Sequence, residues 1–126
     1  MTLADEINRF KSQVPSFVST DIVNIASGLS IGGGSIDPDF DATVASASYA
    51  EVVKSNARAL ELLGMGADTT EDILITTQNA YILIRLLGKE YYHGVAIARD
   101  GNLGLARVIM RKFEPAFLSA LRRLTS

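Results

Sequence analysis

The segments that constrain the fold most are three β-rich stretches at 72–77, 81–87 and 91–98. Only three residues separate each stretch from the next. A connection this short joins antiparallel neighbours, because a parallel crossover needs a dozen or more residues. The second half of the chain therefore predicts an antiparallel sheet, built from strands rich in branched and aromatic side chains.

The first part of the chain predicts a helix followed by a hairpin. Apolar residues recur at helical spacing over 2–14, with Thr2 placed as the N-cap and Pro15 as the stop. Two β-rich stretches, 17–26 and 29–36, follow with Ser27-Gly28 as the turn between them. The glycines at 32–34 have no side chains to pack, so they predict a bulge or the close approach of another backbone.

Two longer helices complete the predicted order. The first spans 41–63, with the Asp-rich run 37–41 at its start and Gly64 after its end. The second follows Asp100-Gly101-Asn102, and its apolar period continues past Pro115, which predicts one kinked helix. The order α-β-β-α-β-β-β-α predicts a single α+β domain over 1–126, with a five-stranded antiparallel sheet packed by helices.

Composition excludes several classes of protein. The chain has a net charge of −2 and no cysteine. A broad basic face for nucleic acid is therefore not expected, nor are disulfides or thiolate metal sites. No apolar run is long enough to span a membrane, and the first residues lack the pattern of a secretory signal. We expect a cytoplasmic domain.

No motif in the chain predicts catalysis. The stretch Gly28-Leu29-Ser30-Ile31-Gly32 matches the Gly-x-Ser-x-Gly pattern of hydrolases, but no helix follows it directly. The glycine run 32–34 lacks the lysine of a phosphate-binding loop. A glycine-rich strand is the better interpretation of both features, so we predict neither an enzyme nor a bound cofactor.

No motif predicts a metal site either. Asp37, Asp39 and Asp41 resemble the start of a calcium loop, but Ala42 and Ser48 stand where that loop needs glycine and glutamate. Carboxylates at a helix N-terminus are favourable without a metal. His93 is the only histidine, and we expect it to be a half-buried strand residue that makes a hydrogen bond.

An excess of apolar surface predicts self-association. The helix at 41–63 carries two apolar rows, more than one sheet face requires, and the strand at 72–77 has no proline or lysine to protect an edge. In that strand Ile73 and Ile75 point one way and Leu74 the other, so we expect both of its faces to be covered. A two-fold dimer follows, unless both elements simply pack inside one core. The predicted interface comprises Tyr49, Val52, Val53, Asn56, Ala57, Leu60, Ile73, Ile75 and Thr77.

The order of elements resembles that of the roadblock/dynein-light-chain family, including its bacterial MglB-like members. The stretches that carry the resemblance are Ile73-Leu74-Ile75-Thr76-Thr77, Tyr81-Ile82-Leu83-Ile84-Arg85 and Asn102-Leu103-Gly104-Leu105-Ala106-Arg107. The run of glycines at 32–34 departs from the family pattern. The resemblance covers nearly the whole chain, and its motifs are diffuse rather than catalytic.

This resemblance implies a homodimer with a continuous sheet, in which the strand at 72–77 pairs with its copy and the helix at 41–63 forms the interface. Members of the family are non-enzymatic platforms for small Ras-like GTPases or motor complexes, and MglB-like members stimulate GTP hydrolysis without donating an arginine. The implied GTPase contact is the polar edge of the helix, Glu51, Lys54, Arg58 and Glu61. The alternative is a structural adaptor in a motor, polarity or signalling complex, with no effect on GTP turnover.

Overall fold

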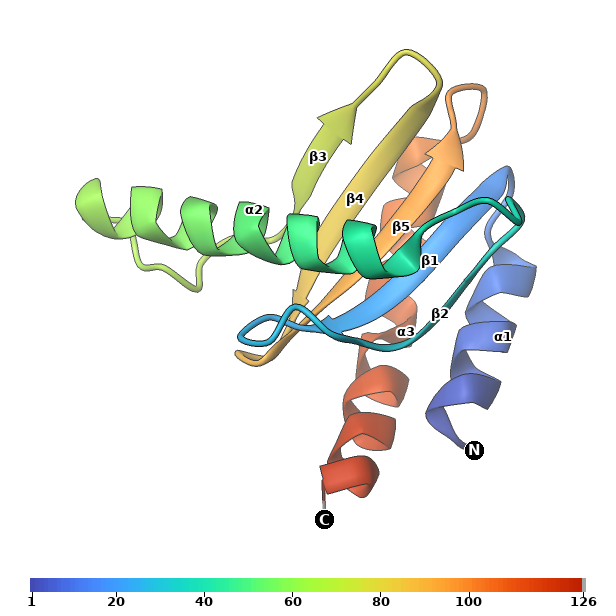
Figure 1. The fold of residues 1–126 in the computed structure, drawn as a ribbon, viewed down its shortest axis with the longest axis horizontal. Coiled ribbons are helices and arrows are strands. Elements are labelled where there is room, and N and C mark those ends of the chain that lie inside the picture. The colour runs from blue at the N-terminus through green and yellow to red at the C-terminus, as the bar shows by residue number, and fades with distance from the viewer. Residues whose placement is uncertain (126) are drawn as a thin grey trace.

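The computed structural model of the chain describes residues 1–125 and has the predicted order of elements (Figure 1). The five strands form one antiparallel sheet in the order β2-β1-β5-β4-β3. The predicted α+β class is confirmed. The elements are α1 (Leu3–Gln13), β1 (Phe17–Asn24), β2 (Ser30–Ser35), α2 (Ala42–Leu62), β3 (Ile73–Thr76), β4 (Ala80–Leu87), β5 (Tyr91–Ala98) and α3 (Leu103–Thr125).

Helices α1 and α2 begin at side-chain caps that the sequence indicated. The Thr2 hydroxyl accepts the Asp5 N–H at 3.1 Å, and the Asp5 carboxylate accepts the Thr2 N–H at 3.0 Å. This capping box satisfies two of the backbone donors that a helix start leaves free. At the start of α2, the Asp41 carboxylate accepts the Val44 N–H at 3.1 Å. Gly64 follows the end of α2 with φ +72°, a conformation that favours glycine.

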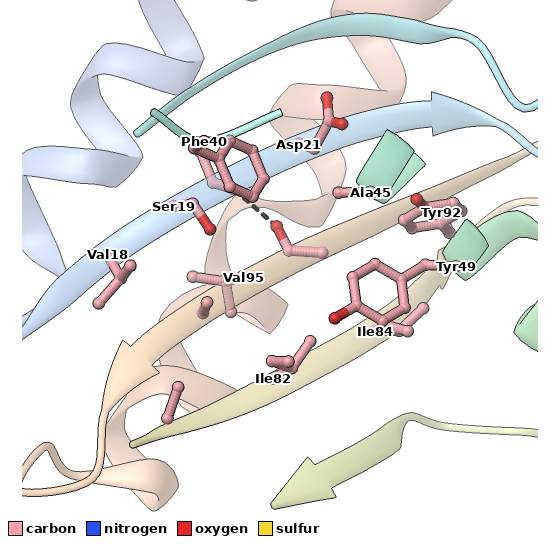
Figure 2. A pocket seen from close by; sticks show the side chains of 14 residues that line it. Val18, Ser19, Asp21, Phe40, Ala45, Tyr49, Ile82, Ile84, Tyr92 and Val95 are labelled. Carbon is pink, nitrogen blue, oxygen red and sulfur yellow. Dashed lines mark hydrogen bonds between the residues drawn. The ribbon is translucent and has the colours of Figure 1, made fainter. Parts of the chain in front are cut away.

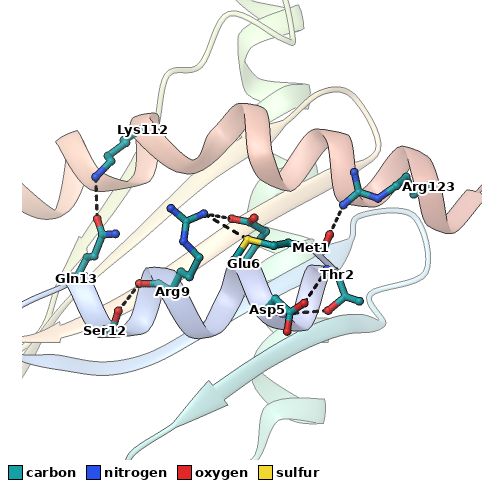
Figure 3. A network of polar contacts seen from close by, with 9 residues as sticks. All are labelled: Met1, Thr2, Asp5, Glu6, Arg9, Ser12, Gln13, Lys112 and Arg123. Atoms are coloured by element: carbon teal, nitrogen blue, oxygen red, sulfur yellow. Dashed lines mark hydrogen bonds and ion pairs between the residues drawn. The ribbon is translucent and has the colours of Figure 1, made fainter.

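Helix α3 runs without a break from Leu103 to Thr125 and includes Pro115. The single helix is therefore confirmed, while the kink stays a prediction. The helix ends beside the start of the chain, where the Arg123 guanidinium donates to the Met1 carbonyl oxygen (Figure 3). Further along, the Lys112 ammonium donates to the Gln13 amide oxygen at 3.0 Å. These contacts join α3 to α1 at both ends of α1.

The glycine run lies in β2 because α1 and β1 approach it closely. A Cβ atom on Gly32 would lie 2.9 Å from the Ile7 Cδ1 atom of α1, and one on Gly33 would collide with the Thr20 carbonyl oxygen of β1. The register between β1 and β2 also shifts next to this run, between Ile22 and Val23 of β1. Both consequences that the glycines predicted, an irregular ladder and a close backbone, are present.

Helices α1 and α3 cover one face of the sheet (Figure 1). We call it the closed face, because α1, α3 and the strands enclose one large apolar core on it. Phe10 is fully buried at its centre, with ring centroids 5.5 Å from Phe113 and 5.9 Å from Phe117. His93 lies in the same core and is 1% exposed, so the half-buried position expected for it was wrong. Its Nε2 atom lies 2.8 Å from the Thr20 hydroxyl, so the expected hydrogen bond is present.

Helix α2 crosses the other face alone (Figure 1), which we call the open face. The buried apolar residues there are few: Val23, Ala50, Val53, Ile84 and Tyr92. Ile73 and Ile75 of β3 pack toward them and are half-buried. The strand was expected to be covered on both faces, but Leu74 is 39% exposed on its closed-face side. The reason is that β3 is an edge strand, whereas α3 packs chiefly against β4.

Candidate partner-binding surface

Helix α2 is anchored to the sheet by its first half and extends past the β3 edge with its second half (Figure 1). The Tyr92 hydroxyl donates to the Ser46 carbonyl oxygen at 2.9 Å, and Ala50 and Val53 are buried against the strands. Past Val53 no residue of the helix is fully buried. There the Asn56 amide donates to the Thr70 hydroxyl at 2.8 Å, which joins the helix to the segment leading back to β3.

The two apolar rows of α2 face in different directions. The row of Tyr49, Val53, Ala57 and Leu60 turns toward the chain itself, and Val53 is only 5% exposed. The other row points outward, with Val52 36% and Leu63 70% exposed. Val53 thus belongs to the core of its own chain, while Val52 and the end of the helix are free for a partner.

The end of α2 exposes more apolar surface than the sequence reasoning identified. Leu62 is 88% and Met65 53% exposed, next to Leu63. The sequence predicts a helix end at Gly64, and the two leucines and the methionine beside it are the signal that this end is unusually apolar. Exposed apolar groups that gather in this way are typical of interaction surfaces.

Strand β3 gives this surface an open backbone edge. Its only neighbour is β4, so the other side of Ile73–Thr76 has no strand partner within the described chain. Thr77 lies just past the strand, where its hydroxyl accepts the Ala80 N–H at 3.0 Å and closes the turn into β4. The structure therefore brings Ile73 and Ile75 together with the inner row of α2 on the open face, and places Thr77 at the turn.

The predicted GTPase-contacting residues lie along one edge of α2, and their side chains are exposed apart from half-buried Lys54. The Lys54 ammonium lies 3.2 Å from the Glu51 carboxylate and also donates to the Ala26 carbonyl oxygen at 3.4 Å. The Arg58 guanidinium donates to the Ser55 hydroxyl at 3.0 Å, and Glu61 lies a turn beyond it. Exposed ion pairs contribute little to stability, so these groups can exchange partners at small cost.

Asp21 and His93, two buried groups with strongly shifted pKa values, lie on opposite faces of the sheet. Burial raises the pKa of the Asp21 carboxyl to about 6, although hydrogen bonds from the Ser30 hydroxyl and the Ile22 N–H oppose this. Burial also lowers the pKa of His93 to about 3, with a smaller contribution from the charge of Arg85. Asp21 faces the α2 side of the sheet and His93 the opposite side. No acid–base pair results from these two groups.

The residues of the hydrolase-like and calcium-loop-like motifs make contacts that support the fold. Ser30 begins β2 rather than a helix, and its hydroxyl donates to the Asp21 carboxylate. Asp41 caps α2, and the Asp37 carboxylate accepts the Asp39 N–H at 2.9 Å. Within residues 1–125, no three His, Cys, Asp or Glu side chains gather as metal ligands would. No helix of that part of the chain has the length and hydropathy to cross a bilayer.

The chain thus has a five-stranded antiparallel sheet with α1 and α3 on one face and a single overhanging α2 on the other. Comparison with solved structures shows which known proteins share this fold. The chain is similar to a structure described as Myxococcus xanthus MglB, with a TM-score of 0.86 and 14% identity over 96% of this chain and 95% of that one. It is also similar to a Roadblock/LC7 domain from Streptomyces avermitilis, with a TM-score of 0.85 and 15% identity over 97% of this chain and 99% of that one.

Other comparisons limit what this structural similarity says about function. No family model and no curated protein sequence matches the chain. Acanthamoeba castellanii profilin II is also similar in fold, with a TM-score of 0.62 and 11% identity over 94% of this chain and 98% of that one. The chain therefore has the MglB-like roadblock fold. Its function must be argued from its surfaces, because one fold serves different functions.

Proposed function

We propose that this chain is a non-enzymatic, homodimeric regulator of a small Ras-like GTPase. The observation that carries the proposal is the unfinished open face, where an apolar helix end extends past an unpaired strand edge. A single copy of the chain would leave both the apolar helix end and the backbone groups of the strand edge exposed to water, which favours binding to a partner. The resemblance to MglB-like proteins supplies the class of partner.

A two-fold axis beside β3 would satisfy both features at once. Pairing the two β3 strands antiparallel extends each sheet into the other and gives the free edge its hydrogen bonds. The same rotation carries the second half of each α2 over the open face of the other copy. There Leu60, Leu63 and Val52 of one copy would cover Ile73 and Ile75 of the other, a self-complementary contact of the kind two-fold dimers use.

The GTPase contact that we propose is the polar edge of α2, formed by Glu51, Lys54, Arg58 and Glu61. In the dimer two such edges would lie on one side of the joined sheet, which gives a broad platform of mixed charge. A regulator of this kind changes turnover only if it binds one nucleotide state of the GTPase more tightly than the other. Stimulation of hydrolysis then requires it to position the GTPase's own glutamine, arginine or attacking water.

The test uses the purified chain and a Ras-like GTPase encoded in the same genome, loaded with GDP or with a GTP analogue. We expect tighter binding to one nucleotide state and faster hydrolysis of GTP. The double variant Lys54→Glu, Arg58→Glu should weaken the binding without changing the native mass. Arg111→Glu is the matched control, because Arg111 is an exposed residue of α3 on the other side of the molecule.

Three outcomes separate the proposals. State-dependent binding with faster hydrolysis supports the regulator. Binding that leaves hydrolysis unchanged favours the structural adaptor, and a pull-down from extract would then identify the other members of its complex. A lack of binding to either nucleotide state across such GTPases would overturn the proposed partner, whatever the native mass of the chain.

A further inference from the structure

A cavity of about 150 Å³ lies between the first half of α2 and strands β1, β5 and β4 (Figure 2). It exists because small residues face each other there. Ala45 is on the helix side, and Gly94 and Ala96 are on β5, so no side chain fills the space between them. The remaining walls are mainly apolar, with the rings of Phe40 and Tyr49 at its sides. A dry apolar cavity of this volume in another protein accommodates benzene.

Two of the hydroxyl-bearing residues that line this cavity, Thr20 and Tyr92, have hydrogen-bond partners within the chain. The Thr20 hydroxyl donates to the Gly94 carbonyl oxygen at 2.8 Å, which is the dashed line in Figure 2. The Tyr92 hydroxyl donates to the Ser46 carbonyl oxygen at 2.9 Å. The Tyr92 hydroxyl therefore needs no ligand, and the Thr20 hydroxyl, which also lies 2.8 Å from the His93 Nε2 atom, is engaged toward the closed face.

Asp21 is the charged residue of this cavity. It lines the cavity and is 9% exposed, and its Oδ1 atom accepts a hydrogen bond from the Ser30 hydroxyl. Its Oδ2 atom is buried and has no hydrogen-bond partner among residues 1–125. No ion pair joins it to a cation of the described chain. A buried carboxylate without a counter-charge is unfavourable, and a cation placed beside it removes much of that penalty.

The apolar walls and the one carboxylate with an unpaired oxygen together indicate the chemistry of a ligand that would fit this cavity. We propose that this cavity binds a small molecule with an apolar body of about the size of a benzene ring and one amino group, whose ammonium faces Asp21. The body replaces the missing side chain between α2 and β5, and the ammonium supplies the missing partner of the carboxylate. This site is separate from the proposed GTPase contact, which lies on the outer edge of α2.

The experiment is a titration of the full-length chain, in its native oligomeric state, followed by backbone amide NMR at pH 7.5. The probes are benzylamine, benzyl alcohol and toluene, which share a ring and differ in the polar group. We expect shifts centred on Gly94, Ala96 and Ala45, with benzylamine bound about tenfold or more tightly than benzyl alcohol. Asp21→Asn should remove that preference and leave toluene binding unchanged.

A second pair of variants tests the position of the site. Ala96→Leu should fill the cavity and abolish binding of all three probes. Ala45→Leu closes it from the helix side, in case the strand variant fails to fold. Ser48→Leu is the control, because Ser48 is an exposed residue of the same helix and its replacement should leave binding unchanged.

The proposal is overturned if benzylamine causes no shifts in the native protein, or if both cavity-filling variants fold and still bind it. An unchanged preference for benzylamine in Asp21→Asn would also contradict it. Binding seen only after Ile75→Asp, which is designed to separate the proposed dimer, would mean that the second copy occupies the cavity. None of these results depends on GTPase binding, so the two proposals can fail separately.

Discussion

The two faces of the sheet differ in how completely the chain covers them. On the closed face, α1 and α3 pack side by side over aromatic residues that are almost entirely buried, and polar contacts join the two helices (Figure 3). On the open face, α2 buries only a few residues and leaves branched side chains of β3 and β4 half-exposed. The closed face thus stabilises the single chain, whereas the open face is available to partners.

The largest expected effect comes from the closed face. Phe117→Ala removes a ring that is 0% exposed and contacts Phe10, Phe113 and His93. We expect the free energy of unfolding to fall by about 3–5 kcal/mol at every protein concentration. Leu63→Ala, at the exposed end of α2, should cost less, and its effect should grow with protein concentration because a contact with the proposed second copy is lost. Urea unfolding at several concentrations measures both, and equal, concentration-independent losses would remove the difference between the faces.

A charge at the β3 edge tests whether the open face forms the proposed dimer interface. Ile75→Asp places a carboxylate where the second copy is expected, and burying it without a partner typically costs several kcal/mol. We expect the native mass to halve while the far-ultraviolet circular dichroism stays that of a folded chain. Leu29→Asp is the matched control, since Leu29 is a 63% exposed apolar residue beside the opposite edge strand, β2. A dimer that survives Ile75→Asp would mean that the interface lies elsewhere.

Asp21 on the open face and His93 on the closed face are both buried, and their titrations change stability in opposite directions with pH. The folded-state pKa of Asp21, about 6, is above its ordinary 3.8, so its contribution to stability is present at low pH and is lost as pH rises through 6. Asp21→Asn should therefore stabilise the protein by roughly 2–3 kcal/mol above pH 7 and change little below pH 4. Thermal unfolding across this range measures the difference. A destabilised variant at pH 7.5 would contradict the assignment.

His93 gives the opposite slope. Its folded-state pKa of about 3 is below the ordinary 6.5, so the neutral ring contributes stability above pH 6.5 that is lost as pH falls toward 3. His93→Gln keeps a hydrogen-bonding group beside Thr20 but cannot titrate. We expect a weaker acid dependence of stability in this variant, most clearly in the Asp21→Asn background, where the opposing slope is absent.

The smallest expected effect compares the helix caps of the two faces. Thr2→Ala removes the capping box of α1, and Asp41→Ala removes the cap of α2; each should cost about 1 kcal/mol. Hydrogen exchange distinguishes them. Fraying should stay within the first turn of α1, which the closed core holds, but spread further along α2, which has fewer buried contacts. Equal protection in both helices would show that α2 is held as firmly as α1.

Much of this fold could be predicted from the sequence because local signals and hydrophobic periods agreed. The cap at Thr2, the turn at Gly28 and the short loops between the last three strands each indicated one structure, and all are present. The positions of side chains depended on tertiary packing, which the sequence alone does not specify. His93 is fully buried because Phe10 of α1 and Phe117 of α3 pack against its ring. Leu74 is exposed because β3 lies at the sheet edge.

The candidate surface was harder to predict than the fold. The sequence shows two apolar rows on α2, but which row faces inward depends on how the helix is rotated about its axis over the strands. That orientation places Val53 in the core, and the second half of the helix extends beyond the β3 edge. The cavity beside Asp21 has no sequence signal, because it arises from small residues on separate elements.

The most direct test of the central claim is the native mass of the chain, measured by light scattering over a range of concentrations. If the open face is completed by a second copy, the mass at micromolar concentration should be twice the 13.5 kDa of the single chain. It should fall toward the single-chain value only on dilution or in Ile75→Asp. A constant mass of 13.5 kDa at the highest attainable concentration would contradict the account.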